Sequence, residues 1–141
     1  MLPLRYARRW RLASAVLLTL VLAVTLMPAI WLWPDRVRTV LWLEHIDKLA
    51  HGATFVLLAL WFAGQYQPRS YPRIAVGLLA FAGLIEVCQR TVGYRSAEWL
   101  DFGADAIGII IGLAIAMAGA GGWCLLFEDW YVGRKSGAAI D

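Results

Sequence analysis

The sequence predicts an all-α protein: a polytopic membrane helix bundle with four transmembrane helices and one short interfacial helix, in a single domain over residues 1–141. The chain is 61% hydrophobic and only 16% charged, whereas a soluble domain is about half apolar and a quarter charged. Long uncharged runs recur along it, and its mean hydropathy is +0.64. Its eight tryptophans suit the boundary between membrane and water.

The first predicted span covers about residues 11–33. It has no charged residue from Leu12 to Trp33, and about 20 apolar residues are enough to cross a bilayer. A cleaved signal peptide is the alternative, because the run follows a basic start. The run is too long for a signal-peptide core and ends in Trp31 and Trp33, so we expect this helix to be retained.

Three further spans are expected after a break at Pro34. Apolar residues at helical spacing follow the break and predict the short interfacial helix before Asp47: Val37, Val40 and Leu41. The later spans are predicted at about residues 49–66, 72–89 and 99–127. The polar tail beyond them is expected to fray.

The basic residues orient these spans. Four arginines and no acid precede the first span, which places the N-terminus in the cytoplasm; an even number of spans returns the C-terminus there. In this topology eight Lys and Arg residues lie inside and five outside. We therefore expect a protein of the cell membrane. Nucleic acid is not an expected partner, because the net charge is only +3.

The predicted topology brings the ionisable residues of the apolar body to one depth, in the outer leaflet. A charge at the centre of a membrane helix costs about 2.5–3.5 kcal/mol, so a cluster at one depth predicts a polar site. The inner halves of the last three spans contain no ionisable residue. The polar residues at the outer ends of these spans are Asp47, Lys48, His51, Glu86, Gln89, Glu98, Asp101 and Asp105.

Helical spacing predicts how these residues face one another. Asp47, Lys48 and His51 share one helix face, because they are three or four residues apart. On the last span the acids lie in one stripe with Gly108 and Gly112. Glycines at this spacing let a neighbouring helix approach closely. We expect helix packing through these glycines, and the pattern makes no prediction of oligomeric state.

These motifs resemble those of the VanZ-like membrane proteins over roughly residues 44–115. The resemblance rests on Asp47-Lys48-x-x-His51-x-x-x-Phe55, Glu86-x-x-Gln89, Arg95 and Asp101-x-x-Ala104-Asp105-x-x-Gly108-x-x-x-Gly112. It implies a multi-pass protein of the cell envelope, in a family named for a protein linked to reduced susceptibility to the glycopeptide antibiotic teicoplanin. The family usually has Asn where this chain has Asp105, so this chain has an extra acid.

Acids outnumber bases in the cluster, which favours acid–base roles or a bound cation. The candidate catalytic residues are His51, Glu86 and Asp101. The candidate substrate-binding residues are Asp47, Lys48, Gln89, Arg95 and Asp105. The three catalytic candidates also offer nitrogen and oxygen ligands for a divalent metal, although not at a recognised metal spacing. No cofactor is predicted, and a divalent metal is the alternative.

Three functions fit this cluster. The preferred one is binding of a lipid headgroup, a lipid-linked envelope precursor or a glycopeptide-type antibiotic at the outer leaflet. The second is a membrane enzyme acting on a lipid-linked substrate by acid–base or hydrolase/transferase chemistry. There His51 is the general base or nucleophile, and Glu86 or Asp101 is its partner. In the third, the charged groups only cap helices and form salt bridges. The sequence leaves catalysis undecided.

Overall fold

The computed structural model describes residues 1–27, 40–92 and 99–137, and within these ranges the regular structure is helical, without a strand. The all-α class is therefore confirmed. The α-helices are α1 (Ala7–Thr25), α3 (Val40–Gln65), α4 (Tyr71–Val92), α5 (Trp99–Ile115) and α6 (Trp123–Gly137). A 3₁₀ turn at Pro68–Ser70 leads into α4, and a π-helical turn at Ala116–Ala120 extends α5.

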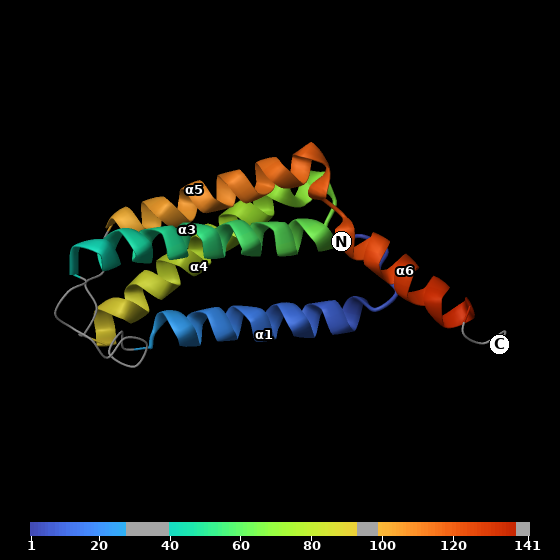
Figure 1. Ribbon diagram of the computed structural model, residues 1–141, viewed down its shortest axis with the longest axis horizontal. Helices are drawn as coiled ribbons and strands as arrows, with labels where there is room; N and C mark the ends of the chain where they lie inside the picture. Colours follow the sequence, from blue (N-terminus) through green and yellow to red (C-terminus); the bar gives the residue numbers. More distant parts are fainter. Residues whose placement is uncertain (28–39, 93–98, 138–141) are drawn as a thin grey trace.

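The helices α1, α3, α4 and α5 form a bundle, and α6 projects from one end of it (Figure 1). The most extensive packing is between α3 and α5. The buried core includes Phe55 and Leu58 of α3, Ile85 of α4 and Ile109 of α5. Leucine and valine side chains of α1 cover one side of this core.

Two segments of the described chain are long and apolar enough to cross a membrane. They are Pro68–Thr91, with 24 residues, and Trp99–Ala120, with 22 residues. Pro72 lies in the first turn of α4, where a proline removes no intrahelical hydrogen bond. Length and hydropathy make α4 and α5 candidate spans, and membrane crossing by the four helices stays a prediction.

The first helix differs from its predicted limits of residues 11–33. It begins at Ala7 and ends at Thr25. The end is explained by Pro28, because proline disfavours helical conformation in the residue before it. The early start depends on a distant carboxylate described below.

The prediction of a separate interfacial helix is wrong from Val40 onward, because Val40 already belongs to α3. Neither glycine nor proline lies between Val40 and His51, so nothing in the local sequence ends the helix at the membrane border. The predicted break at Pro34 lies outside the described residues.

The fourth predicted span, residues 99–127, is too long, and the predicted frayed tail contains a helix. The chain turns between Ala120 and Trp123, where α6 begins. Gly119 has φ 129° and Gly122 has φ 72°, conformations that glycine adopts without steric cost and other residues rarely adopt. A Cβ on Gly121 would collide with the Tyr71 hydroxyl. These glycines let the chain change direction at the end of α5.

Candidate functional site

The predicted convergence of polar residues is found at one end of the bundle. The end of α4 and the starts of α3 and α5 lie together there, at the left of Figure 1. The site residues buried at this end are His51, Glu86, Gln89, Asp101 and Asp105. The side chains of Asp47 and Arg95 lie outside the described part of the chain.

The most deeply buried pair joins α3 to α5. His51 Nδ1 lies 3.3 Å from Asp105 Oδ1, and both side chains are buried. A proton on Nδ1 donates to the carboxylate and leaves Nε2 as an acceptor. The sequence predicts Glu86 or Asp101 as the partner of His51, whereas the side chain in contact with His51 Nδ1 is Asp105. An aspartate that accepts a hydrogen bond from Nδ1 fixes the orientation of the histidine ring, as it does in sites where histidine is a general base.

A second pair lies one helical turn nearer the starts of α3 and α5. Lys48 Nζ is 3.4 Å from Asp101 Oδ1, and Lys48 is partly exposed whereas Asp101 is buried. The two pairs connect α3 and α5 at positions one helical turn apart. Lys48 and His51 are about one turn apart on α3, and Asp101 and Asp105 are about one turn apart on α5, which runs parallel to it. This register explains why Asp105, rather than Asp101, reaches His51.

Glycines allow α3 and α5 to approach closely in the turns that follow these two pairs. A Cβ on Gly108 would collide with the carbonyl oxygen of Gly52. A Cβ on Gly112 would lie 2.6 Å from the carbonyl oxygen of Val56 and 2.7 Å from Ala59 Cβ. Backbones this close leave no room for a side chain on that stripe of α5, so the acids above it face α3.

Helix α4 adds a third carboxylate to the site. Glu86 is buried, and its Oε1 lies 3.6 Å from an Arg90 guanidinium nitrogen. It also interacts electrostatically with Asp101 and His51. Among the described residues, Glu86 Oε1 and Asp101 Oδ1 have no hydrogen-bond partner. Their basic neighbours are within ion-pair distance, but not in hydrogen-bond geometry, so each oxygen retains an unmet need for a donor.

Gln89 has a structural contact of its own. Its Nε2 donates to the carbonyl oxygen of Thr25 at 3.2 Å. Thr25 is the last residue of α1, where backbone carbonyls lack intrahelical donors. Gln89 therefore ties the end of α1 to α4.

Within the described residues, no group of three or more His, Cys, Asp and Glu side chains is arranged to hold a metal ion. The histidine, the two aspartates and the glutamate instead lie in pairs with one another or with a basic residue.

A groove of about 560 Å³ runs between α3 and α5, starting at Lys48. Its walls are apolar or backbone, and they include Val56, Ile107 and Ile111. From Lys48 to Val56 the groove follows eight residues of α3, or about 12 Å at the helical rise. One end is thus polar and the rest is apolar.

The other end of the bundle has a polar cluster that the sequence analysis missed. Glu128 of α6 is buried and accepts three hydrogen bonds, from Arg5 N (2.7 Å), Tyr6 N (3.1 Å) and Trp10 Nε1 (2.8 Å). A carboxylate at these orphan amides stabilises the start of α1. Glu128 is the first acid after a long uncharged run, and that isolation was the signal available in the sequence.

Cys124 lies beside this cluster and is fully buried. Burial, with a smaller contribution from the Glu128 carboxylate, raises the pKa of the Cys124 thiol from 9.0 to about 12. The thiol therefore stays protonated in the folded protein where an unfolded chain would ionise, so folding stability falls as the pH rises above about 9.

A labelling experiment tests this assignment. Because the thiolate is the reactive form, we expect Cys124 in a Cys88→Ser variant to resist maleimide at pH 7.5 and to react fully in denaturing detergent. Free cysteine at the same pH is the control. Complete labelling of the folded protein within minutes would contradict the buried position.

The outside of the bundle has the opposite character from these interior clusters. The exposed leucines and valines of α1 recur every four residues and form one apolar stripe: Leu12, Val16, Leu20 and Val24. Large apolar side chains are also exposed on α4 and α5, including Val76, Val87, Ile107 and Ile110. Exposed apolar surfaces mark contacts with a membrane or with another protein, and the length and hydropathy of the segments containing α4 and α5 favour the membrane.

An apolar exterior around buried carboxylates, histidine and glutamine defines the class: a helical membrane protein with a polar site between its helices. The chain belongs to the VanZ/LLP1 family, whose model matches residues 3–124. This confirms the resemblance drawn from residues 44–115 and supports a place in the cell envelope. No curated protein and no solved structure matches the chain.

Proposed function

We propose that the protein crosses the cell membrane four times, through α1, α3, α4 and α5, with both termini in the cytoplasm. Arg5 before α1 and the three arginines in its first two turns, Arg8, Arg9 and Arg11, support this orientation through the positive-inside rule. The buried cluster of His51, Glu86, Asp101 and Asp105 then lies in the outer leaflet. The helix α6 lies on the cytoplasmic side.

The site binds the headgroup of a lipid or of a lipid-linked envelope precursor. The observation that carries this proposal is the groove between α3 and α5, which starts at Lys48 and continues over apolar residues. A lipid has the same division, with a polar head at the membrane surface and a chain directed toward the midplane. A glycopeptide-type antibiotic also has polar groups that could bind at Lys48. The apolar walls of the groove favour a lipid over such an antibiotic as the ligand.

The Lys48–Asp101 pair determines the headgroup chemistry. Lys48 is partly exposed at the end of the groove, where its ammonium can bind a lipid phosphate. Asp101 does not itself line the groove, but its Oδ1 lies 3.4 Å from Lys48 Nζ and has no hydrogen-bond partner among the described residues. A donor on a headgroup bound at Lys48 would supply that partner. A headgroup with a phosphate and a primary ammonium or hydroxyl group meets both requirements.

The second candidate is an enzyme, favoured by the His51–Asp105 contact of 3.3 Å. A buried histidine oriented by a carboxylate is equipped to accept a proton from a lipid hydroxyl or from water. Lys48 would hold the phosphate next to the reacting group. The lipid-binding and enzymatic functions share one ligand class and differ in whether the ligand is changed.

Native mass spectrometry of the purified full chain tests headgroup binding. We expect about tenfold tighter binding of phosphatidylethanolamine, which has N–H donors, than of phosphatidylcholine, which has none. Asp101→Asn should remove most of this preference. Ala53→Leu, which fills the groove, should weaken binding of both lipids.

Two control variants accompany this experiment. Asp129→Asn removes an exposed carboxylate of α6, and Ala80→Leu enlarges an exposed residue of α4 outside the groove; both should bind as the original protein does. Equal binding of the two lipids, or binding that Ala53→Leu leaves unchanged, would refute the site.

His51→Ala separates the two candidates. A lipid product that forms with the original chain and not with this variant establishes an enzyme. Unchanged lipid with both proteins leaves binding as the function. A variant that does not accumulate in the membrane indicates that His51 and Asp105 stabilise the bundle.

A further inference from the structure

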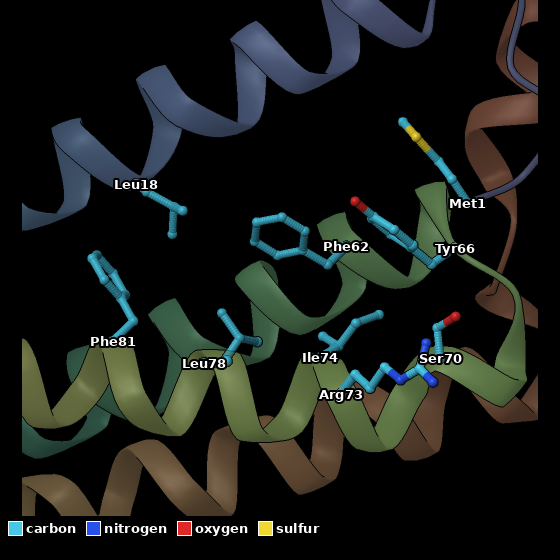
Figure 2. Close-up of a pocket in the computed structure, with 10 residues that line it drawn as sticks. Met1, Leu18, Phe62, Tyr66, Ser70, Arg73, Ile74, Leu78 and Phe81 are labelled. Carbon is cyan, nitrogen blue, oxygen red and sulfur yellow. The ribbon is translucent and has the colours of Figure 1, made fainter.

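A second hollow lies in the other half of the bundle, between α1, α3 and α4 (Figure 2). Its volume is about 420 Å³, within the range of about 300–1,000 Å³ for small-ligand sites. Its walls are formed by apolar side chains: Leu18, Phe62, Ile74, Leu78 and Phe81. None of these belongs to the acidic cluster.

The polar groups of this hollow are gathered at one end. Tyr66, Ser70 and Arg73 line it there, and Figure 2 shows the Arg73 side chain extending toward Ser70. Leu18 and Phe81 lie at the other end. From Ser70 to Phe81 the wall follows eleven residues, or about 16 Å of helix, which is half of the ~30 Å hydrocarbon core.

The polar end is positively charged. Arg73 lines this end and is exposed, and in the described part of the chain it forms no ion pair. In the orientation proposed above, this end lies at the cytoplasmic surface. Basic pockets between membrane helices on that side attract anionic headgroups.

We propose that this hollow binds one anionic phospholipid of the cytoplasmic leaflet. The Arg73 guanidinium and the Ser70 hydroxyl donate to its phosphate. One acyl chain follows the apolar wall past Ile74 and Leu78 to Phe81, near the midplane. This site is separate from the outer groove and selects a net negative charge, whereas the outer site selects a hydrogen-bond donor.

Binding of phosphatidylglycerol and phosphatidylcholine to the full chain, measured by native mass spectrometry, tests the proposal. We expect phosphatidylglycerol to bind about tenfold more tightly. Arg73→Gln should lower this affinity about tenfold. It should weaken phosphatidylcholine binding less, because the choline cation of that lipid already balances the phosphate that Arg73 contacts. Arg69→Gln is the matched control, because it removes the same charge from a residue outside the hollow.

A second pair of variants tests the apolar wall. Gly77 lines the hollow, and a Cβ there would contact nothing within 4 Å, so Gly77→Leu fills the space without a collision at Cβ. This variant should weaken the binding of both lipids by about tenfold or more. Gly83 on the same helix also has open space and lies outside the hollow, so Gly83→Leu should have no effect.

Equal losses in Arg73→Gln and Arg69→Gln would show an effect of surface charge alone and would overturn the proposal. Phosphatidylglycerol binding that Gly77→Leu leaves unchanged would place the lipid elsewhere, with the same consequence. The measurement does not depend on membrane orientation or on the outer groove. Failure here is therefore distinguishable from failure of the outer site, which Asp101→Asn and Ala53→Leu test.

Discussion

Gly108→Ala is expected to lower the unfolding temperature of the purified protein by roughly 10 °C, equivalent to about 2–3 kcal/mol. The added methyl group would collide with the carbonyl oxygen of Gly52. Because this neighbour is backbone, it cannot move aside as a flexible side chain would. The helices α3 and α5 must separate, and the His51–Asp105 and Lys48–Asp101 contacts above the glycine are lost with them.

Gly103→Ala on the same helix is the matched control. A Cβ on Gly103 meets nothing within 4 Å, so this variant should be neutral or more stable by about 0.5–1 kcal/mol through improved helix propensity. The eight tryptophans make intrinsic fluorescence a suitable readout. Equal unfolding temperatures for the two variants would show that α3 and α5 do not approach at Gly108.

Glu128→Ala is expected to release the start of α1, with amide hydrogen exchange over residues 5–10 faster by roughly 100-fold, or about 2.7 kcal/mol. Glu128 accepts hydrogen bonds from Arg5 N, Tyr6 N and Trp10 Nε1. Its removal leaves three partly buried donors without their acceptor. Glu128→Gln, which keeps one carbonyl oxygen, should have a smaller effect.

The neighbouring acid provides the control for Glu128. Asp129 is exposed, so Asp129→Ala should leave exchange over residues 5–10 unchanged. Exchange that accelerates equally in both variants would indicate a general effect of charge on α6. Exchange that changes in neither would mean that the carboxylate does not hold the first turn of α1.

The sequence predicted much of the helical fold because hydrophobic runs and their interruptions are local properties. The limits of α3 at Gln65 and of α4 near Pro72 follow from residues within or next to those helices. The end of α5 was missed because Gly119 and Gly122 lie in an uncharged run. Their positive φ angles, rather than any loss of hydrophobicity, change the direction of the chain there.

The sequence predicted which residues gather at the candidate site better than it predicted which of them contact one another. Topology and helical spacing were enough to bring His51, Glu86, Asp101 and Asp105 to one end. Choosing between Asp101 and Asp105 as the partner of His51 required the relative register of α3 and α5. That register depends on backbone contact at Gly52 and Gly108, which no spacing within one helix contains.

By itself, the sequence determined a helical protein with an apolar exterior and a polar cluster at one end, because period and hydrophobicity act along each helix separately. The tertiary structure alone decided that Asp105 contacts His51 and that Glu128 stabilises the distant start of α1. It also decided that one hollow lies between α3 and α5 and another between α1, α3 and α4. These features depend on distances between helices. Such distances are set by how closely two backbones pack, and only the assembled bundle contains that information.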